Sequence, residues 1–438
     1  MNHLCSSLNI LLLISLLACF VHARRGDGAS RYSRSPIRVE EDSDEIWGIN
    51  ASDPWLSGDP ADYLLPPTQS ATAKTAKIRG KKFSPQDFLE GHHLYSDATT
   101  SAFEGEKLLY VTPWNQKGYG MATLLRRKLT WLAPVWFQIR KDPLAAAAEG
   151  GAEGEGGLGE DGKQKARVKV DGEEGADLPW LRAVGSASQA GDVDAEDAAP
   201  CREPPRVLLV PRVSLECELG TLEEMEQAAA GLVALLGRLE AQDAKVDGFT
   251  LEIPFAQLDA ALFIPGYLRE LRPDIKLIMV LPAVKILPAD TDEGKQHRQV
   301  LDLLAQSVDR LSVTTYDRAM DGSPHAPYHW VKEVMLSLRS VQSLQSKLLM
   351  GLPFYGWRDG EDMTAERMVQ WLATDDSVKV TWDIVAQEHT WSDSRGKSAS
   401  YPTPHMIQRR LELARELGLQ GVAIWEGGQG LAAAVDLL

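Results

Sequence analysis

A glutamate at the end of a strand-like segment is the residue of this chain whose position most suggests chemistry. Residues 246–254 read VDGFTLEIP, and in a strand the side chains of Thr250, Glu252 and Pro254 would share one face. A carboxyl group such as that of Glu252 can act as a general acid. Pro254, which would lie about 7 Å farther along at about 3.3 Å per residue, cannot donate a proton. Glu252 therefore belongs either to a ligand site or to a buried structural group satisfied by neighbouring donors.

Aromatic residues fall at or just after the ends of several predicted strands. They are Trp114, Tyr316, Tyr355 and Trp425. Aromatic rings stack on the apolar faces of pyranose rings, and a cleft with indoles and converging carboxylates suits an oligosaccharide. Each of these residues can instead be a packing residue of the core. The sequence therefore favours a saccharide-binding cleft without excluding a purely structural role.

The elements that would position these residues alternate between short apolar runs and helical stretches. The predicted strands are 108–112, 132–139, 207–213, 248–253, 276–282, 311–316, 347–354 and 421–425. Near-continuous apolar strands separated by helices predict a closed parallel (β/α)8 barrel, a TIM barrel, over residues 106–438. An open doubly wound sheet is the alternative, but no glycine-rich phosphate loop follows the first strand.

Two regions depart from this alternation. Residues 143–200, between the second and third strands, are dominated by Gly, Ala, Glu and Asp, which predicts a flexible acidic insert around a short helix at 178–184. Residues 24–105 predict a mostly irregular leader with one helix at 85–94. A basic cluster at 77–82 is either a solvated loop or a processing or receptor site.

The amino terminus predicts export. An apolar run from Ile10 to Val21 and the small residue Ala23 are typical of a signal peptide over residues 1–23. A membrane anchor is the alternative, although the run is shorter than the roughly 20 residues that span a bilayer. We expect a secreted or lysosomal protein without a membrane span in the mature chain. Cys201 and Cys217 could then pair, and Asn50 could be glycosylated.

Charge and motifs exclude several classes of function. The 438 residues carry 62 acidic against 46 basic side chains, a formal net charge of −16, which argues against a nucleic-acid partner. There is no HExxH, no cysteine pair at metal-binding spacing and no P-loop. We expect neither a metal nor an organic cofactor.

Several motifs together resemble those of the family 18 glycoside hydrolases. The family's D-G-x-D-x-D-x-E pattern is similar to residues 247–254, with Thr250 and Glu252 at the second and third Asp and Pro254 at the proton-donating Glu. Tyr316-Asp317 resembles the Tyr-Asp after the sixth strand, and residues 351–356, GLPFYG, the motif after the seventh. Trp425 stands where the family stacks a sugar ring. Residues 380–389 resemble a small hairpin inserted between strands 7 and 8, which adds Trp382 to the candidates.

The resemblance implies binding of N-acetylated, chitin-type oligosaccharides in a cleft at the carboxyl ends of the strands. The substrate-binding residues that it implies are Trp114, Glu252, Tyr316, Asp317, Tyr355, Trp382 and Trp425. Hydrolysis is doubtful because Pro254 replaces the acid, and no catalytic residue is expected. The first alternative is a hydrolase that uses Glu252 as a displaced acid, which requires that no Arg or Lys engage its carboxylate. The second is a scaffold for a receptor protein, since one fold hosts many functions.

Overall fold

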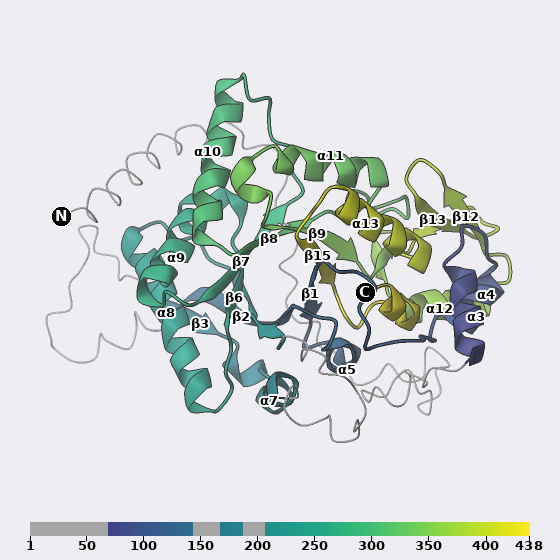
Figure 1. Cartoon of the computed structure of the whole chain (residues 1–438), viewed down its shortest axis with the longest axis horizontal. Coiled ribbons are helices and arrows are strands. Elements are labelled where there is room, and N and C mark those ends of the chain that lie inside the picture. The colour runs from purple at the N-terminus through teal and green to yellow at the C-terminus, as the bar shows by residue number, and fades with distance from the viewer. Residues whose placement is uncertain (1–68, 143–166, 187–205) are drawn as a thin grey trace, which may run out of the picture.

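The structure is a computed structural model that describes residues 69–142, 167–186 and 206–438 (Figure 1). The predicted signal peptide at 1–23, most of the leader, Asn50 and Cys201 lie outside the described residues. Within the described part, no helix is both long enough and apolar enough to cross a membrane.

A closed parallel barrel forms the body of the protein and confirms the predicted (β/α)8 architecture. β1 pairs in parallel with both β2 and β15, which closes the sheet. The barrel strands are β1 (Glu106–Val111), β2 (Trp131–Asp142), β4 (Leu208–Leu209) with β5 (Arg212–Leu215), β6 (Gly248–Glu252), β7 (Lys276–Pro282), β8 (Arg310–Thr314), β9 (Leu348–Pro353) and β15 (Gly421–Trp425). The third strand is broken into β4 and β5 on either side of Pro211, which has no N–H to give to the ladder.

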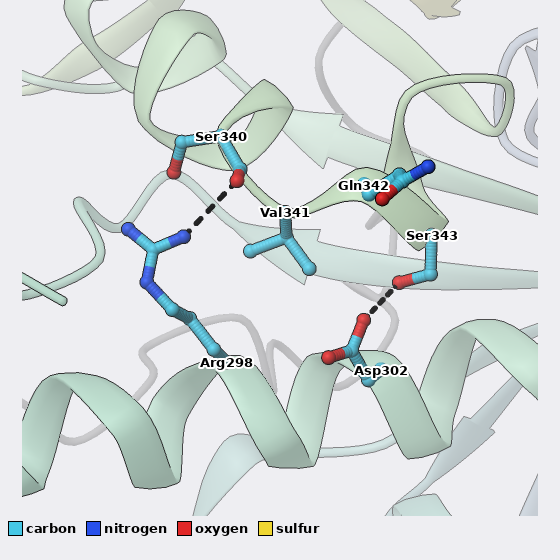
Figure 2. A pocket seen from close by; sticks show the side chains of 6 residues that line it. All are labelled: Arg298, Asp302, Ser340, Val341, Gln342 and Ser343. Carbon is cyan, nitrogen blue, oxygen red and sulfur yellow. Dashed lines mark hydrogen bonds between the residues drawn. The ribbon is translucent and has the colours of Figure 1, made fainter.

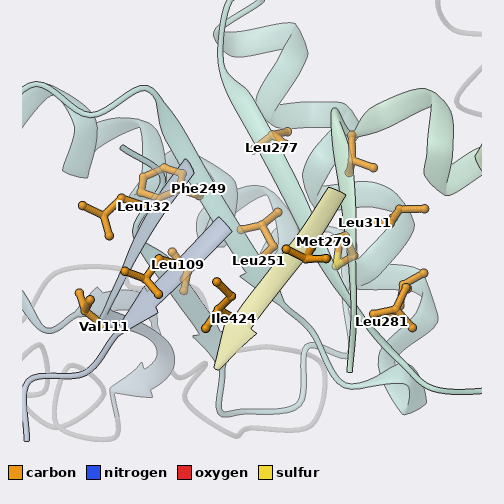
Figure 3. Packing of buried hydrophobic residues seen from close by; sticks show 14 of the residues in the cluster. Leu109, Val111, Leu132, Phe249, Leu251, Leu277, Met279, Leu281, Leu311 and Ile424 are labelled. Atoms are coloured by element: carbon orange, nitrogen blue, oxygen red, sulfur yellow. The ribbon is translucent and has the colours of Figure 1, made fainter. Parts of the chain in front are cut away.

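The barrel strands are apolar on both faces because one face lines the interior and the other packs on helices. Leu108 and Tyr110 point inward with Ala423, whereas Leu109 and Ile424 join the outer layer, part of which is drawn in Figure 3. The helices of that layer are α5 (Gln116–Leu125), α7 (Leu178–Ser186), α8 (Leu222–Ala241), α9 (Leu258–Leu271), α10 (Asp292–Ser307), α11 (Tyr328–Arg339) and α13 (Pro404–Glu416).

Part of the predicted acidic insert is regular structure. The predicted short helix is present as α7, and β3 (Arg167–Asp171) pairs antiparallel with β2, which the sequence did not predict. Gly172 ends β3 with a φ of 110°, and a Cβ there would lie 2.0 Å from the carbonyl oxygen of Trp136. Only glycine fits this turn, which returns the chain to the barrel surface.

An antiparallel sheet of five strands lies between β9 and β15. Its strands are β10 (Gly356–Arg358), β11 (Glu361–Met363), β12 (Lys379–Asp383), β13 (Glu388–Ser392) and β14 (Ser398–Ser400), and α12 (Ala365–Thr374) accompanies them. The predicted hairpin is present as β12 and β13. It is one part of a larger inserted subdomain.

Two helices that precede the barrel complete the core of this subdomain. They are α3 (Gln69–Ile78) and α4 (Pro85–Gly91), the latter close to the predicted helix at 85–94. Ile78 and Phe88 are fully buried against Met368 and Trp391. A capping box between Ser84 and Asp87 fixes the start of α4. The α3–α4 hairpin lies beside β12 and β13 (Figure 1).

Candidate saccharide site

Glu252 lies on the inward face at the carboxyl end of β6 and is engaged by an arginine. Arg212, on the neighbouring strand β5, donates from Nε to Oε2 of Glu252 at 2.5 Å, and its Nη2 contacts the same oxygen. The Glu252 side chain is 34% exposed and that of Arg212 is 14% exposed. Thr250, two residues earlier, is fully buried and donates to the carbonyl oxygen of Val210 at 3.0 Å. Pro254 lies beyond the end of β6 and is exposed.

Arg212 also connects Glu252 to Trp425 at the end of β15. Its guanidinium carbon lies 5.7 Å from the centre of the Trp425 indole, which is half-buried. A guanidinium over an indole is a favourable cation–π contact. We call Arg212, Glu252 and Trp425 the mouth cluster. Arg212 was not among the residues predicted from the sequence, although an arginine inside the apolar run 207–213 was a signal that could have identified it.

Tyr110 forms the floor beneath the mouth cluster. Its ring centre lies 5.2 Å from that of Trp425, and its hydroxyl donates to Oγ of Ser312 on β8 at 3.0 Å. Burial raises the pKa of Tyr110, so the hydroxyl keeps its proton. The floor is therefore closed by a satisfied hydrogen bond between strands on opposite sides of the barrel.

A second group of predicted residues gathers after β8. Asp317, at a positive φ of 61°, accepts at Oδ1 from the Tyr355 hydroxyl at 2.5 Å and from Nε1 of Trp357 at 2.7 Å. Tyr355 is only 5% exposed, and half-buried Tyr316 meets its ring edge-on at 6.2 Å. The structure thus brings Tyr316, Asp317 and Tyr355 together. Tyr355 holds the Asp317 carboxylate from within the core.

The two remaining predicted aromatic residues lie in different surroundings. Trp114 is 70% exposed in the loop between β1 and α5, so its ring is accessible to a ligand. Trp382 lies on β12, with its ring 4.7 Å from that of His389 and 4.6 Å from that of His405. It packs within the inserted subdomain and against the start of α13, so its recorded contacts do not include the mouth cluster.

A hollow of the described surface lies elsewhere. It measures about 490 Å³ between α10 and the turn after α11, and its lining is polar (Figure 2). Arg298 donates there to the carbonyl oxygen of Ser340, and Ser343 bonds to Asp302. None of its lining residues belongs to the mouth cluster. Because a barrel of this class places its chemistry at the carboxyl ends of the strands, we assign the site to the mouth cluster rather than to this hollow.

The described residues contain no group of three or more His, Cys, Asp or Glu side chains arranged to hold a metal ion. Within the mouth cluster, Arg212 donates to Oε2 of Glu252 and lies over the indole of Trp425.

Comparison with known proteins agrees with this geometry. Residues 226–430 match the model of the glycosyl hydrolases family 18. A chitinase from Chromobacterium violaceum is similar in structure, with 16% identity, a TM-score of 0.53 and coverage of 76% of this chain and 97% of that one. A class V chitinase from Nicotiana tobaccum matches at 12% identity with a TM-score of 0.53, covering 76% and 98%. The spore cortex-lytic enzyme SleL of Bacillus cereus matches at 16% identity with a TM-score of 0.53, covering 78% and 76%. At these identities the structures establish a shared fold.

Proposed function

We propose that this chain, whose residues 226–430 match the model of the glycosyl hydrolases family 18, is a chitinase-like protein that binds N-acetylated oligosaccharides at the barrel mouth without hydrolysing them. The observation that carries the proposal is the ion pair between Arg212 and Glu252. It lies beside a half-buried indole and at the position where a hydrolase of this architecture would need a free carboxyl group.

The ion pair argues against Glu252 as a displaced acid. Glycosidic cleavage requires a group that holds a proton near the leaving oxygen. The carboxylate of Glu252 instead accepts hydrogen bonds from a guanidinium, and Thr250 donates its only proton to the backbone. Pro254 has no proton to give. The hypothesis that Glu252 is a displaced acid required that no Arg or Lys contact its carboxylate. The contact with Arg212 therefore favours saccharide binding over hydrolysis.

The same contact is suited to hydroxyl recognition. Both recorded contacts between Arg212 and Glu252 use Oε2, so Oε1 can accept from a sugar hydroxyl. The remaining N–H groups of the guanidinium can donate to neighbouring sugar oxygens. Trp425, adjacent to both, supplies an apolar surface for the ring.

Two finer proposals accompany this function. The order of the motifs resembles that of chitinase domain-containing protein 1, a chitinase-like protein, and we propose that relationship. We also propose a secreted or lysosomal location, because residues 1–23 have the form of a signal peptide.

The proposal is tested with the purified mature chain and chitotetraose. We expect measurable affinity by calorimetry, and no hydrolysis of a fluorogenic chitooligosaccharide between pH 4 and 7 by the wild type or by Glu252→Gln. Trp425→Ala should weaken binding at least about tenfold, as for a central aromatic anchor. Trp180→Ala is the matched control, because it removes an indole that packs on Tyr119 outside the barrel. Turnover that disappears only in Glu252→Gln would show that Glu252 is a working acid, and absence of affinity in the wild type would refute saccharide binding.

A further inference from the structure

Glu426, the residue after Trp425, is a buried carboxyl group that forms no ion pair within the described part of the chain. Glu426 as a whole is only 1% exposed. It accepts from Nδ2 of Asn115 at Oε1, at 2.8 Å, and from the N–H of Gly428 at Oε2, at 3.1 Å. No Lys or Arg among the described residues forms an ion pair with it. A carboxylate buried in this way is expensive unless it is neutral or fully hydrogen-bonded.

The contacts of Glu426 join two loops of the barrel mouth. β1 and β15 are neighbours in the sheet, with Leu109 opposite Ile424. Asn115 directly follows the exposed Trp114, and Glu426 directly follows Trp425. The hydrogen bond between Asn115 and Glu426 therefore links the loop that carries Trp114 to the end of the strand that carries Trp425.

The backbone around this link is closely packed. The N–H of Gly427 donates to the carbonyl oxygen of Tyr110 at 3.0 Å. A Cβ at Gly428 would lie 2.5 Å from the Asn115 amide, and a Cβ at Gly118 would lie 3.0 Å from Oε2 of Glu426. Glycine at both positions allows the two loops to approach until only the carboxyl and amide groups separate them.

We propose that Glu426 is a positioning residue of the saccharide site, which fixes Trp425 and Trp114 relative to each other through its bond to Asn115. The proposal rests on the proposed function, because it assigns both indoles to one ligand. Glu426 does not touch the sugar. The exposed ring of Trp114 then provides a second stacking surface for the sugar, beside Trp425.

The link is sensitive to protonation. Burial raises the pKa of Glu426 to about 8, and Glu366 on α12 acts in the same direction. The other titratable groups nearby are Lys117, which is paired with Glu366, Tyr119 on the same helix, and His92 after α4. Below pH 8 the neutral carboxyl group can donate its proton to Oδ1 of a rotated Asn115 amide and accept from Gly428. Above pH 8 the charge is buried without a cation, and the loops should separate.

The test compares Glu426→Gln and Glu426→Ala with the wild type. Gln is uncharged like the protonated carboxyl group and keeps a donor group and an acceptor at the same place, whereas Ala removes both. We expect the affinity for chitotetraose to fall on the order of tenfold in Glu426→Ala, as for loss of a buried hydrogen-bonded anchor, and to be nearly unchanged in Glu426→Gln. Between pH 7 and 9 the wild type should lose affinity while Glu426→Gln remains constant. Glu333→Gln, which changes an exposed carboxyl group on α11 that pairs with Lys285, is the control.

Amide hydrogen exchange of residues 112–118 without ligand separates this inference from the proposed function. Exchange should accelerate in Glu426→Ala, and in the wild type above pH 8 after correction for intrinsic rates, but not in Glu426→Gln. If the wild type bound no saccharide yet showed this exchange pattern, saccharide binding would be refuted, but the hydrogen bond between Glu426 and Asn115 would still be shown to hold the two segments together. If Glu426→Ala changed neither the exchange nor the affinity, the positioning role of Glu426 would be refuted. The same conclusion would follow if the affinity of Glu426→Gln fell between pH 7 and 9 as it does in the wild type.

Discussion

Replacement of Glu388 by alanine is expected to lower the free energy of unfolding by about 3–5 kcal/mol. Glu388 on β13 is 2% exposed and lies 3.3 Å from Nη2 of Arg410 on α13, which is 1% exposed. Burial lowers the pKa of Arg410 to about 10, so the guanidinium is still charged at neutral pH. Without Glu388 that charge would remain buried with neutral groups, the carbonyl oxygens of Ala326, Ala386 and Gln387 and the ring of Tyr328.

Thermal unfolding at pH 7 would measure this loss as a fall in Tm of roughly 5 °C, because a given loss of free energy shifts the Tm less in a large protein. Glu388→Gln should lose less, because it keeps an acceptor for the N–H of Ala326. Glu333→Ala breaks the exposed pair with Lys285 and should leave the Tm almost unchanged, since exposed pairs contribute little. A Tm for Glu388→Ala equal to that of Glu333→Ala would show that the buried pair does not join the inserted subdomain to α13.

The barrel could be predicted because its strands are continuous apolar runs that a parallel, doubly covered sheet requires. The inserted sheet could not be predicted in full, because several of its strands lack such apolar runs. β10, β11 and β14 read GWR, EDM and SAS, which are too short and too polar to show an alternation. Their core comes partly from α3 and α4, which precede the barrel by sequence, and residues so far apart leave no local pattern.

The positions of candidate site residues could be predicted from the sequence of a single strand. Contacts between residues on two neighbouring strands could not be predicted in this way. Glu252 and Trp425 could be placed from the inward face of their own strands. The contact of Glu252 with Arg212 depends on the register of β5 against β6, in which Arg212 lies opposite Thr250, and one strand alone does not specify that register. Trp382 was predicted at the cleft by analogy with a hairpin. Its ring contacts His389 and His405, and its place in the cleft stays a prediction.

Acidification is expected to loosen the attachment of the α3–α4 hairpin to the inserted subdomain. His389 is 1% exposed, with Nδ1 2.7 Å from Oγ1 of Thr403 and Nε2 3.2 Å from the carbonyl oxygen of Lys81, in the loop between α3 and α4. His92, 6% exposed, lies directly after α4. Burial lowers the pKa of each histidine to about 4. The two rings lie where the hairpin meets the rest of the protein.

The direction of this pH effect on stability follows from the unfolded chain, in which a histidine titrates near pH 6.5. Because the folded pKa is lower, the unfolded state binds the proton more tightly, so this stabilisation is complete above pH 6.5 and is lost as the pH falls toward 4. A shift from 6.5 to about 4 corresponds to roughly 3 kcal/mol for each histidine. The charged and titratable groups that face His389 and His405 are Lys81, Arg409 and Glu412, and those that face His92 are His93 and Lys117.

The whole-protein pH profile would combine this effect with an opposite one. The pKa of Glu426, about 8, lies above its unfolded value of 4.5, so that group stabilises the fold as the pH falls from 8 to 4.5. A variant must therefore isolate the histidine. His389→Gln can donate to the carbonyl oxygen of Lys81 and accept from Thr403 without titrating, whereas His297→Gln changes an exposed histidine on α10.

Hydrogen exchange of residues 73–92 between pH 7 and 4 would show the difference. The wild type and His297→Gln should lose protection in this segment below pH 6.5, and His389→Gln should keep more of it. The difference in opening free energy between His389→Gln and the wild type should change by roughly 3 kcal/mol over this range. If all three proteins lost protection equally, protonation of His389 would not drive the opening, and the carbonyl of Lys81 would be a packing contact that tolerates a charged ring.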